Sequence, residues 1–233
     1  MPTSQLILAL DVPTLDDACA LVERVGDAIG MAKVGLELFV RTGPEAVTRV
    51  RALGLPVFLD LKLHDIPETV DRAVASACGL GATLLTVHAS GGPRMLERAQ
   101  ARAEREDTGL AIVAVTVLTS HDSSSLTAIG INESPETHAT RLADVASSSG
   151  IGAFVCSPYE VRSLRKRLGD SVTLITPGVR APGQAHGDQA RVMTPREAVL
   201  SGATWLVVGR PIRDATEPRA AALALLEDAR GTR

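Results

Sequence analysis

Short apolar runs alternate along this chain with longer amphipathic stretches, and this alternation limits the choice of fold more than any other feature. Short runs rich in Val, Ile and Leu are typical of buried strands, whereas apolar residues spaced three or four apart indicate helices. The predicted strands are Leu6 to Leu10, Met31 to Val34, Val57 to Leu61, Leu84 to Val87, Ile112 to Leu118, Ala153 to Cys156, Thr173 to Thr176 and Trp205 to Val208. The predicted helices are Leu15 to Val25, Pro44 to Leu53, Glu68 to Ala77, Pro93 to Arg105, Glu136 to Ala146, Glu160 to Leu168, Pro195 to Leu200 and Pro218 to Ala229.

Eight predicted strands, each followed by a helix, indicate an α/β protein with a (β/α)8 TIM barrel. A doubly wound sheet is the structural alternative, but it usually has fewer strands and a glycine-rich first turn. The first turn here is Asp11-Val12-Pro13-Thr14. No Pro/Gly/Ser-rich linker divides the chain, so we expect residues 1–233 to form a single barrel domain.

Composition and charge are those of a globular protein that does not depend on a polyanionic partner. Hydrophobic residues make up 45% of the chain but aromatic residues only 2%, so Ala, Val and Leu must fill the core. The formal net charge of -3 argues against a nucleic-acid or membrane-surface protein. A local basic site for a phosphate remains compatible with it.

The cysteines and the N-terminal region favour a cytoplasmic protein. Cys19, Cys78 and Cys156 have no C-x-x-C spacing, so we expect reduced core thiols rather than a disulfide framework or a zinc site. The apolar run from Leu6 to Leu10 is too short for a signal peptide or a transmembrane helix.

Charged residues interrupt the apolar run that begins at Val57. Residues i and i+2 of a strand lie on one face, so Asp60 and Lys62 are expected side by side, and Asp65 follows in the loop before a helix. A buried charge without a partner is costly, so these groups need each other or a ligand. By itself the pattern Asp-x-Lys-x-x-Asp is not specific, and a solvated run or a structural ion pair is the commoner explanation.

The position of these charges favours catalysis. In (β/α)8 enzymes the active residues lie at the C-terminal ends of the strands. Polar residues end the first five predicted strands at Asp11, Lys33, Asp60 with Lys62, His88 and Thr119. They are all expected at the same end of the barrel.

A phosphate site is predicted after the seventh and eighth strands, where such barrels often bind phosphate. The seventh strand continues into Thr176-Pro177-Gly178-Val179-Arg180 and a glycine-rich segment with Gln184, Gly187, Asp188 and Gln189, which we expect to act as a lid. The eighth ends at Gly209-Arg210-Pro211-Ile212. Glycines admit an anion close to backbone N–H groups, and Arg210 adds a forked cationic donor. Ordinary tight turns with Arg210 in a surface ion pair are the alternative.

Taken together, the sequence motifs resemble the orotidine 5'-phosphate decarboxylase family. They span residues 10–211: Leu10-Asp11-Val12-Pro13, Lys33-Val34-Gly35, Asp60 to Val70, Thr86-Val87-His88-Ala89, Leu118-Thr119-Ser120, Thr176 to Arg180, Gly187-Asp188-Gln189 and Val208-Gly209-Arg210-Pro211. The resemblance implies a homodimer of barrels that converts orotidine 5'-monophosphate (OMP) to UMP in de novo pyrimidine biosynthesis, with no metal or organic cofactor.

The resemblance also implies a role for each site residue. Lys62 would protonate C6 as carbon dioxide leaves, and Asp60 would crowd the substrate carboxylate and hold Lys62. Asp65 and Thr69 would reach into the neighbouring subunit's site. The remaining implied contacts are Asp11 and Lys33 with the ribose and the charged network, Thr119 with the pyrimidine, and Arg180, Gln189, Gly209 and Arg210 with the phosphate.

Elementary chemistry supports the role of Lys62. A carbanion without a cofactor as electron sink must be stabilised by a preorganised positive charge. Lys62 is the only basic residue at its strand end, and Asp60 and Asp65 beside it would favour its charged form.

Two other functions stay open. A Mg²⁺-dependent sugar-phosphate decarboxylase of the same barrel group, acting for example on 3-keto-L-gulonate 6-phosphate, would share the Asp-x-Lys-x-x-Asp pattern. The segments Ile66-Pro67-Glu68-Thr69 and Gly187-Asp188-Gln189 resemble the nucleotide enzyme instead. A non-catalytic nucleotide-phosphate binding barrel is the second alternative, although such a protein would not need to confine Lys62 between carboxylates.

Two further patterns have plainer explanations. His64 and His88 lack a third ligand at metal spacing, so no metal site is predicted, and His88 is expected to order the polar network. Ser120-His121-Asp122 is expected to form a loop and a helix cap, because adjacent residues cannot converge as a catalytic triad.

Overall fold

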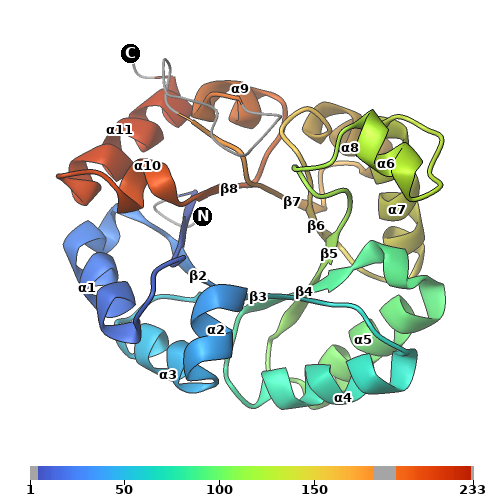
Figure 1. The fold of residues 1–233 in the computed structure, drawn as a ribbon, viewed down its shortest axis with the longest axis horizontal. Coiled ribbons are helices and arrows are strands. Elements are labelled where there is room, and N and C mark those ends of the chain that lie inside the picture. Colours follow the sequence, from blue (N-terminus) through green and yellow to red (C-terminus); the bar gives the residue numbers. More distant parts are fainter. Residues whose placement is uncertain (1–4, 181–192, 232–233) are drawn as a thin grey trace.

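The computed structural model describes residues 5–180 and 193–231, and its strands form a closed eight-stranded barrel (Figure 1). All strands are parallel and follow chain order, and β8 closes the barrel against β1. The strands are β1 (Leu6–Ala9), β2 (Met31–Gly35), β3 (Val57–Leu63), β4 (Leu84–His88), β5 (Ala111–Val115), β6 (Ala153–Val155), β7 (Thr173–Thr176) and β8 (Trp205–Val208). The predicted (β/α)8 TIM barrel is confirmed.

Helices surround the barrel and cover the outer face of its strands (Figure 1). They are α1 (Leu15–Val25), α2 (Leu36–Thr42), α3 (Glu45–Ala52), α4 (Pro67–Cys78), α5 (Pro93–Glu106), α6 (Ser123–Ala128), α7 (Pro135–Ser148), α8 (Val161–Leu168), α9 (Pro195–Leu200), α10 (Arg210–Arg213) and α11 (Pro218–Arg230), with short 3-10 turns η1 (Gly26–Ala28) and η2 (Ala89–Gly91). None of these described helices is long and apolar enough to cross a membrane.

Local sequence signals explain where helices begin. Thr14 caps α1 by accepting a hydrogen bond from the Asp17 N–H, and Thr194 and Glu197 form a capping box at α9. Asp122 caps α6 in the same way. The run Ser120-His121-Asp122 is therefore a loop and helix cap, as predicted.

The core has two layers that together position the site. The larger layer lies between the strands and the helices, where the buried faces of the helices pack. The smaller layer fills the inside of the barrel and consists of Ile7, Ala9, Met31, Phe58, Leu84, Val113, Ala153, Ile175 and Val207. Because side chains alternate along a strand, the residues two positions after Phe58 and Leu84 also face inward, and these are Asp60 and Thr86. A polar layer therefore lies on the apolar one at the C-terminal ends of the strands.

Three short helices and two strand ends differ from the sequence prediction. α2, α6 and α10 were not predicted, because their short sequences show no clear amphipathic pattern. β3 continues to Leu63 rather than ending at Leu61, whereas β5 ends at Val115 rather than at Leu118. The remaining strands agree with the prediction to within one residue at each end.

Candidate active site

Asp60 is the centre of a buried ion cluster at the end of β3. Its Oδ1 and Oδ2 atoms lie 2.9 and 2.8 Å from the Lys62 Nζ. Its Oδ2 also lies 3.4 Å from the Lys33 Nζ, and Thr86 donates a hydrogen bond of 3.0 Å to its Oδ1. Both carboxylate oxygens are thus engaged by cationic or hydroxyl groups.

Lys33 connects this cluster to the end of β1. Its Nζ lies 3.3 Å from the Asp11 Oδ1 as well as contacting Asp60. Gly35 leaves room for this arrangement, since a Cβ there would lie only 2.8 Å from the Lys33 Nζ. The chain of contacts Asp11, Lys33, Asp60 and Lys62 joins three neighbouring strand ends.

The cluster stabilises its own ionisation. Burial works to raise the pKa of Asp60, but the ammonium groups of Lys33 and Lys62 and the hydrogen bonds outweigh it, so this pKa lies below its ordinary value. Burial likewise works to lower the pKa of Lys33, and the carboxylates of Asp60 and Asp11 outweigh it and raise this pKa. Both groups are therefore charged at neutral pH.

The contact between Asp60 and Lys62 has a different origin from the one expected from strand alternation. The register of β3 against β4 shifts between Leu59 and Leu63, and within this bulge Lys62 has a left-handed backbone with φ 51°. Such backbone is uncommon for a residue other than glycine, asparagine or aspartate. The bulge directs the lysine side chain onto the carboxylate, as bulges near active sites often do.

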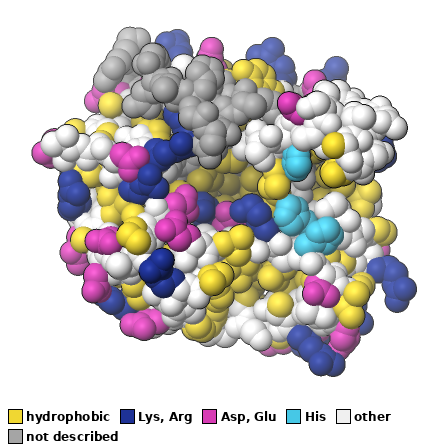
Figure 2. All heavy atoms as spheres, in the orientation of Figure 1, with side chains coloured by type: hydrophobic (Ala, Val, Ile, Leu, Met, Phe, Trp, Pro, Cys, Tyr) yellow, Lys and Arg dark blue, Asp and Glu magenta, His cyan; other side chains and the backbone are white. Residues whose placement is uncertain are grey.

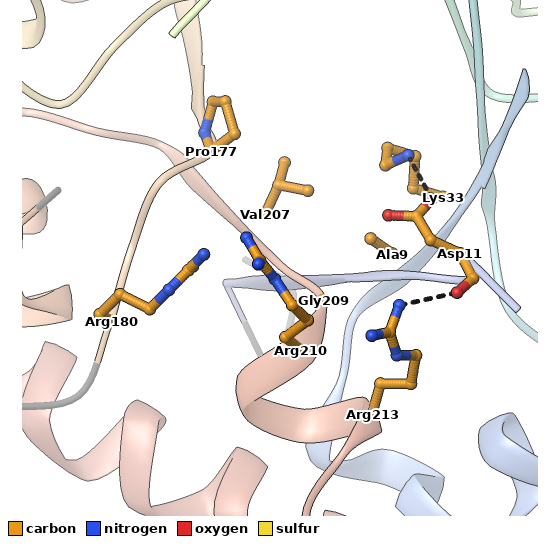
Figure 3. Close-up of a pocket in the computed structure, with 9 residues that line it drawn as sticks. All are labelled: Ala9, Asp11, Lys33, Pro177, Arg180, Val207, Gly209, Arg210 and Arg213. Carbon is orange, nitrogen blue, oxygen red and sulfur yellow. Dashed lines mark hydrogen bonds and ion pairs between the residues drawn. The ribbon is translucent and has the colours of Figure 1, made fainter. Parts of the chain in front are cut away.

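A cavity of about 420 Å³ adjoins the Lys33 side of the cluster (Figure 3). It is lined by Ala9, Asp11, Lys33, Pro177, Arg180, Val207, Gly209, Arg210 and Arg213. Figure 3 shows the side chains of Arg180 and Arg210 converging on one side of this space, with Asp11 and Lys33 on the other. A site with this many guanidinium groups is suited to a phosphate.

A second cavity of about 170 Å³ lies over the Asp60 and Lys62 side chains. It shares Lys33, Pro177 and Val207 with the first, so the two form one continuous hollow. Most of its other lining residues are apolar, namely Phe58, Val115, Val117, Leu118 and Val155, and Thr119 is also at its edge. This part can accept a flat ring whose faces lie against these apolar walls.

Figure 2 shows the same hollow on the surface, with Lys, Arg, Asp and Glu side chains gathered around a hydrophobic interior and histidines nearby. The rings of His64 and His88 lie 5.5 Å apart between centroids. Burial, together with the electrostatic influence of His64 and Lys62, lowers the pKa of His88. Within the described part of the chain, no group of three or more His, Cys, Asp or Glu could hold a metal ion.

Arg213 is a lining residue that sequence reasoning missed. Its Nη1 donates to the backbone oxygen of Asp11 at 2.8 Å, and its Nε donates to Asp214 at 2.6 Å. It lies in α10, three residues after Arg210, so both arginines lie on one side of this short helix. Pro211 is a sequence signal that could have identified this helix, because proline favours the first turn of a helix. A helix that starts there places Arg213 beside Arg210.

Two predicted site residues lie outside the hollow, and a third is not among the described residues. Asp65 and Thr69 are exposed near the start of α4, and the Asp65 Oδ1 accepts a hydrogen bond of 2.6 Å from its neighbour Ile66. Neither residue lines either cavity. Gln189 lies outside the described residues, as do Gln184, Gly187 and Asp188 and the lid predicted from them.

Comparisons with known proteins agree with this geometry. The family model described as "Orotidine 5'-phosphate decarboxylase / HUMPS family" matches residues 4–225. The orotidine 5'-phosphate decarboxylase of Anaeromyxobacter sp. (strain K) is 50% identical over 224 residues, which cover 96% of this chain and 97% of that protein. The enzyme of the same name from Chromohalobacter salexigens is 46% identical over 95% of this chain and 94% of its own length.

The solved structures lead to the same family. The crystal structure of orotidine 5'-phosphate decarboxylase from Lactobacillus acidophilus superposes with a TM-score of 0.83 at 33% identity and covers 96% of this chain and 98% of its own. A family match over nearly the whole chain and relatives at about half identity leave one assignment. The chain belongs to the orotidine 5'-phosphate decarboxylase / HUMPS family.

Proposed function

We propose that this protein decarboxylates OMP to UMP. The observation that carries the proposal is the single hollow with guanidinium groups at one end and the Asp60–Lys62 pair under apolar walls at the other. A nucleotide has the same polarity, with a phosphate dianion at one end and a planar base at the other. Relatives about half identical to this chain carry the name of this enzyme.

Each part of the substrate has a matching region. The phosphate fits beside Arg180, Arg210 and the backbone of Gly209, where charge-assisted hydrogen bonds are strong. The ribose would lie near Asp11 and Lys33, which line the passage between the two ends. The pyrimidine fits between the apolar walls of the second cavity, with Thr119 at its edge.

The reaction follows from the charges at the base end. A substrate carboxylate on C6 would lie against the buried Asp60 carboxylate, so its ground state is destabilised and loss of carbon dioxide relieves the repulsion. The C6–carboxylate bond breaks and leaves its electron pair on C6. The Lys62 ammonium stabilises this pair and then transfers a proton to it, which forms the C6–H bond of UMP. Lys33 keeps its charge, because its pKa is raised, and compensates Asp60 throughout.

We infer that the active form is a homodimer in which Asp65 and Thr69 complete the partner's site. Their exposure at the start of α4 supports this inference, since both are available to a second chain. Large apolar side chains are also exposed, namely Ile66 at 66% beside Asp65, and Leu36 at 50% and Val40 at 80% in α2, and they favour a covered surface. A two-fold interface would bring each Asp65 to the other protomer's hollow.

The cellular setting is also an inference. Free cysteine thiols persist in reducing compartments, and Cys19, Cys78 and Cys156 are all unpaired, which supports a cytoplasmic location. Making UMP from OMP implies a role in de novo pyrimidine biosynthesis. We further infer that residues 1–233 form one domain, with Gln189 acting on the phosphate from the segment outside the described residues.

The sugar-phosphate alternative is less compatible with the second cavity. A polyhydroxylated substrate would place its hydroxyl groups against Phe58, Val115 and Val155, which offer no hydrogen-bonding side chains. A pure binding protein is disfavoured on energetic grounds, because a buried Asp60 between two lysines costs desolvation that binding alone does not require.

The decisive test is the loss of orotate absorbance from OMP by the purified protein in the presence of EDTA. We expect turnover that EDTA does not diminish. Protein carrying Lys62→Ala, purified in the same way, is the control for a contaminating enzyme. No turnover at any OMP concentration would overturn the proposal, and Mg²⁺-dependent release of carbon dioxide from 3-keto-L-gulonate 6-phosphate by the same protein would then favour the sugar-phosphate branch.

A further inference from the structure

The bulge in β3 faces a single residue of β4. The two strands pair at Leu59 with Leu85 and again at Leu63 with Val87. Thr86 is therefore the one β4 residue opposite the longer β3 segment that contains Asp60 and Lys62. In this segment the backbone cannot follow the regular ladder of a parallel sheet, so its polar groups need other partners.

The Thr86 hydroxyl is such a partner for one backbone group of this segment, and it also bonds to one of the segment's side chains. It accepts a hydrogen bond of 2.8 Å from the backbone N–H of Lys62 and donates one of 3.0 Å to the Asp60 Oδ1. A hydroxyl has one proton to donate and lone pairs to accept, so both bonds can exist together. Thr86 is fully buried, and water cannot readily replace it.

We propose that Thr86 is a positioning residue that holds Lys62 and Asp60 in the geometry required for proton transfer to C6. The inference rests on the proposed function and adds a residue to it. A left-handed backbone is unfavourable for lysine and persists only where its surroundings fix it. The hydrogen bond to the Lys62 N–H fixes it here.

The second hydrogen bond sets the rotation of the Asp60 carboxylate. Oδ1 lies between the Thr86 hydroxyl and the Lys62 Nζ, while Oδ2 lies between Lys62 and Lys33. Without the hydroxyl, the carboxylate can rotate toward the lysines and the bulge can relax. A shift of about 1 Å in a reacting group can cost about 100-fold in rate.

Two substitutions of Thr86 separate the effect of its side-chain shape from the effect of its hydroxyl. Thr86→Val keeps the branched shape and removes the hydroxyl, whereas Thr86→Ser keeps the hydroxyl. Thr116→Val is a matched control, because Thr116 is also buried, follows the end of the next strand and uses its hydroxyl only on the Val155 backbone oxygen. Should Thr86→Val fail to fold, Thr86→Ala against Thr86→Ser makes the same comparison.

We expect kcat for OMP to fall about 100-fold in Thr86→Val, while KM and the affinity for UMP change by less than about threefold, since the guanidinium end is untouched. Thr86→Ser should restore most of kcat. In the plot of kcat against pH, the acid limb should move to higher pH in Thr86→Val only. The reason is that Asp60 loses a hydrogen bond that stabilises its charged form, so its pKa rises.

Thr116→Val should lower the melting temperature without moving that limb. If Thr86→Val keeps the wild-type kcat and pH profile, or loses no more than Thr116→Val does, the positioning role is wrong. An inactive wild-type protein would instead contradict the proposed function, so the two failures are distinguishable.

Discussion

The Lys62 ammonium contacts both carboxylate oxygens of Asp60, at 2.9 and 2.8 Å. Both residues lie in the part of β3 where the regular pairing with β4 is interrupted. The pair therefore depends on a local departure from ideal strand geometry. In the proposed reaction, this close contact would place a cation where negative charge develops on C6 and a carboxylate where carbon dioxide departs.

Lys62→Ala should abolish most of the activity without loss of binding. In the proposed mechanism the ammonium both stabilises developing charge and donates a proton, so we expect kcat to fall by about 10,000-fold or more. UMP affinity, measured by calorimetry, should stay within about threefold, because Lys62 does not line the arginine-rich cavity. The exposed Lys166→Ala in α8 is the control. A Lys62→Ala protein with wild-type kcat would refute the assigned role.

Gly35→Ala should reduce catalysis more than stability. The new Cβ would lie 2.8 Å from the Lys33 Nζ and 3.2 Å from the Asp11 Oδ1, so Lys33 must move away from its carboxylates. The backbone at Gly35 has φ -95°, which alanine adopts freely, so unfolding free energy should change by less than about 1 kcal/mol. We expect kcat/KM to fall at least about tenfold.

Gly152→Ala is the matched control for this change, because an exposed Cβ there meets no atom within 4 Å. Urea unfolding and steady-state kinetics of both variants give the comparison. Equal kinetics in Gly35→Ala and the wild type would mean that Lys33 need not occupy its observed position.

The stability of the ion cluster should depend on pH through Asp60. Asp60→Asn leaves Lys33 and Lys62 without their shared carboxylate. We expect this change to lower the unfolding free energy at pH 7 by about 2 kcal/mol. The value is modest because Lys62 is partly exposed. The pKa of Asp60 is lowered on folding. Its contribution is thus complete above the unfolded pKa of about 4 and is lost as pH falls toward the folded pKa.

The difference between wild type and Asp60→Asn should accordingly stay constant from about pH 5 to 8 and shrink as the pH falls below about 4. Urea unfolding across this range measures it. A difference that grows on acidification would show that the carboxylate is not stabilised in its charged form.

The sequence was sufficient to predict the barrel and the strand ends of the site. A short apolar run such as Leu84 to Val87 favours a buried strand, and a charge such as Asp60 at the end of such a run is conspicuous. Because parallel strands in a barrel share one C-terminal end, Asp11, Lys33 and Asp60 could be expected together before any coordinates.

Other features depend on tertiary context and left no reliable pattern. The left-handed backbone of Lys62 is imposed by the pairing of β3 with β4, and no local sequence signal requires it. The sequence does not distinguish Thr86 from an ordinary strand residue, because its role depends on the contact between its hydroxyl and the bulge. α2 has exposed apolar residues at Leu36 and Val40, which obscure the amphipathic pattern that would have identified it.

Arg210→Ala should discriminate phosphorylated from unphosphorylated substrate. A guanidinium that faces the phosphate binds only the former, so kcat/KM for OMP should fall about 100-fold, and the slow reaction of orotidine should change by less than about threefold. Arg180 and Arg213 remain in the cavity and limit the loss. Arg167→Ala, which removes a surface ion pair with Asp144, is the control. Equal losses with both substrates would show that Arg210 does not bind the phosphate.

The proposed shared site makes a prediction for mixed dimers. Lys62→Ala and Asp65→Ala homodimers should each be severely impaired. In a heterodimer of the two, one site collects both defects, and the other combines an intact Lys62 with an intact Asp65 from the partner. Differently tagged chains, co-expressed and purified through both tags, should recover up to about half of the wild-type activity per dimer.

A second heterodimer provides the control, because Asp60 and Lys62 contact each other within one chain. Pairing Lys62→Ala with Asp60→Asn leaves one lesion in each site, so no activity should return. If Asp65 acted in its own chain, the Lys62→Ala and Asp65→Ala heterodimer would behave like this control. Recovery in the first heterodimer and not in the second therefore requires Asp65 to cross the interface, whereas inactivity in both would remove the shared site from the proposed mechanism.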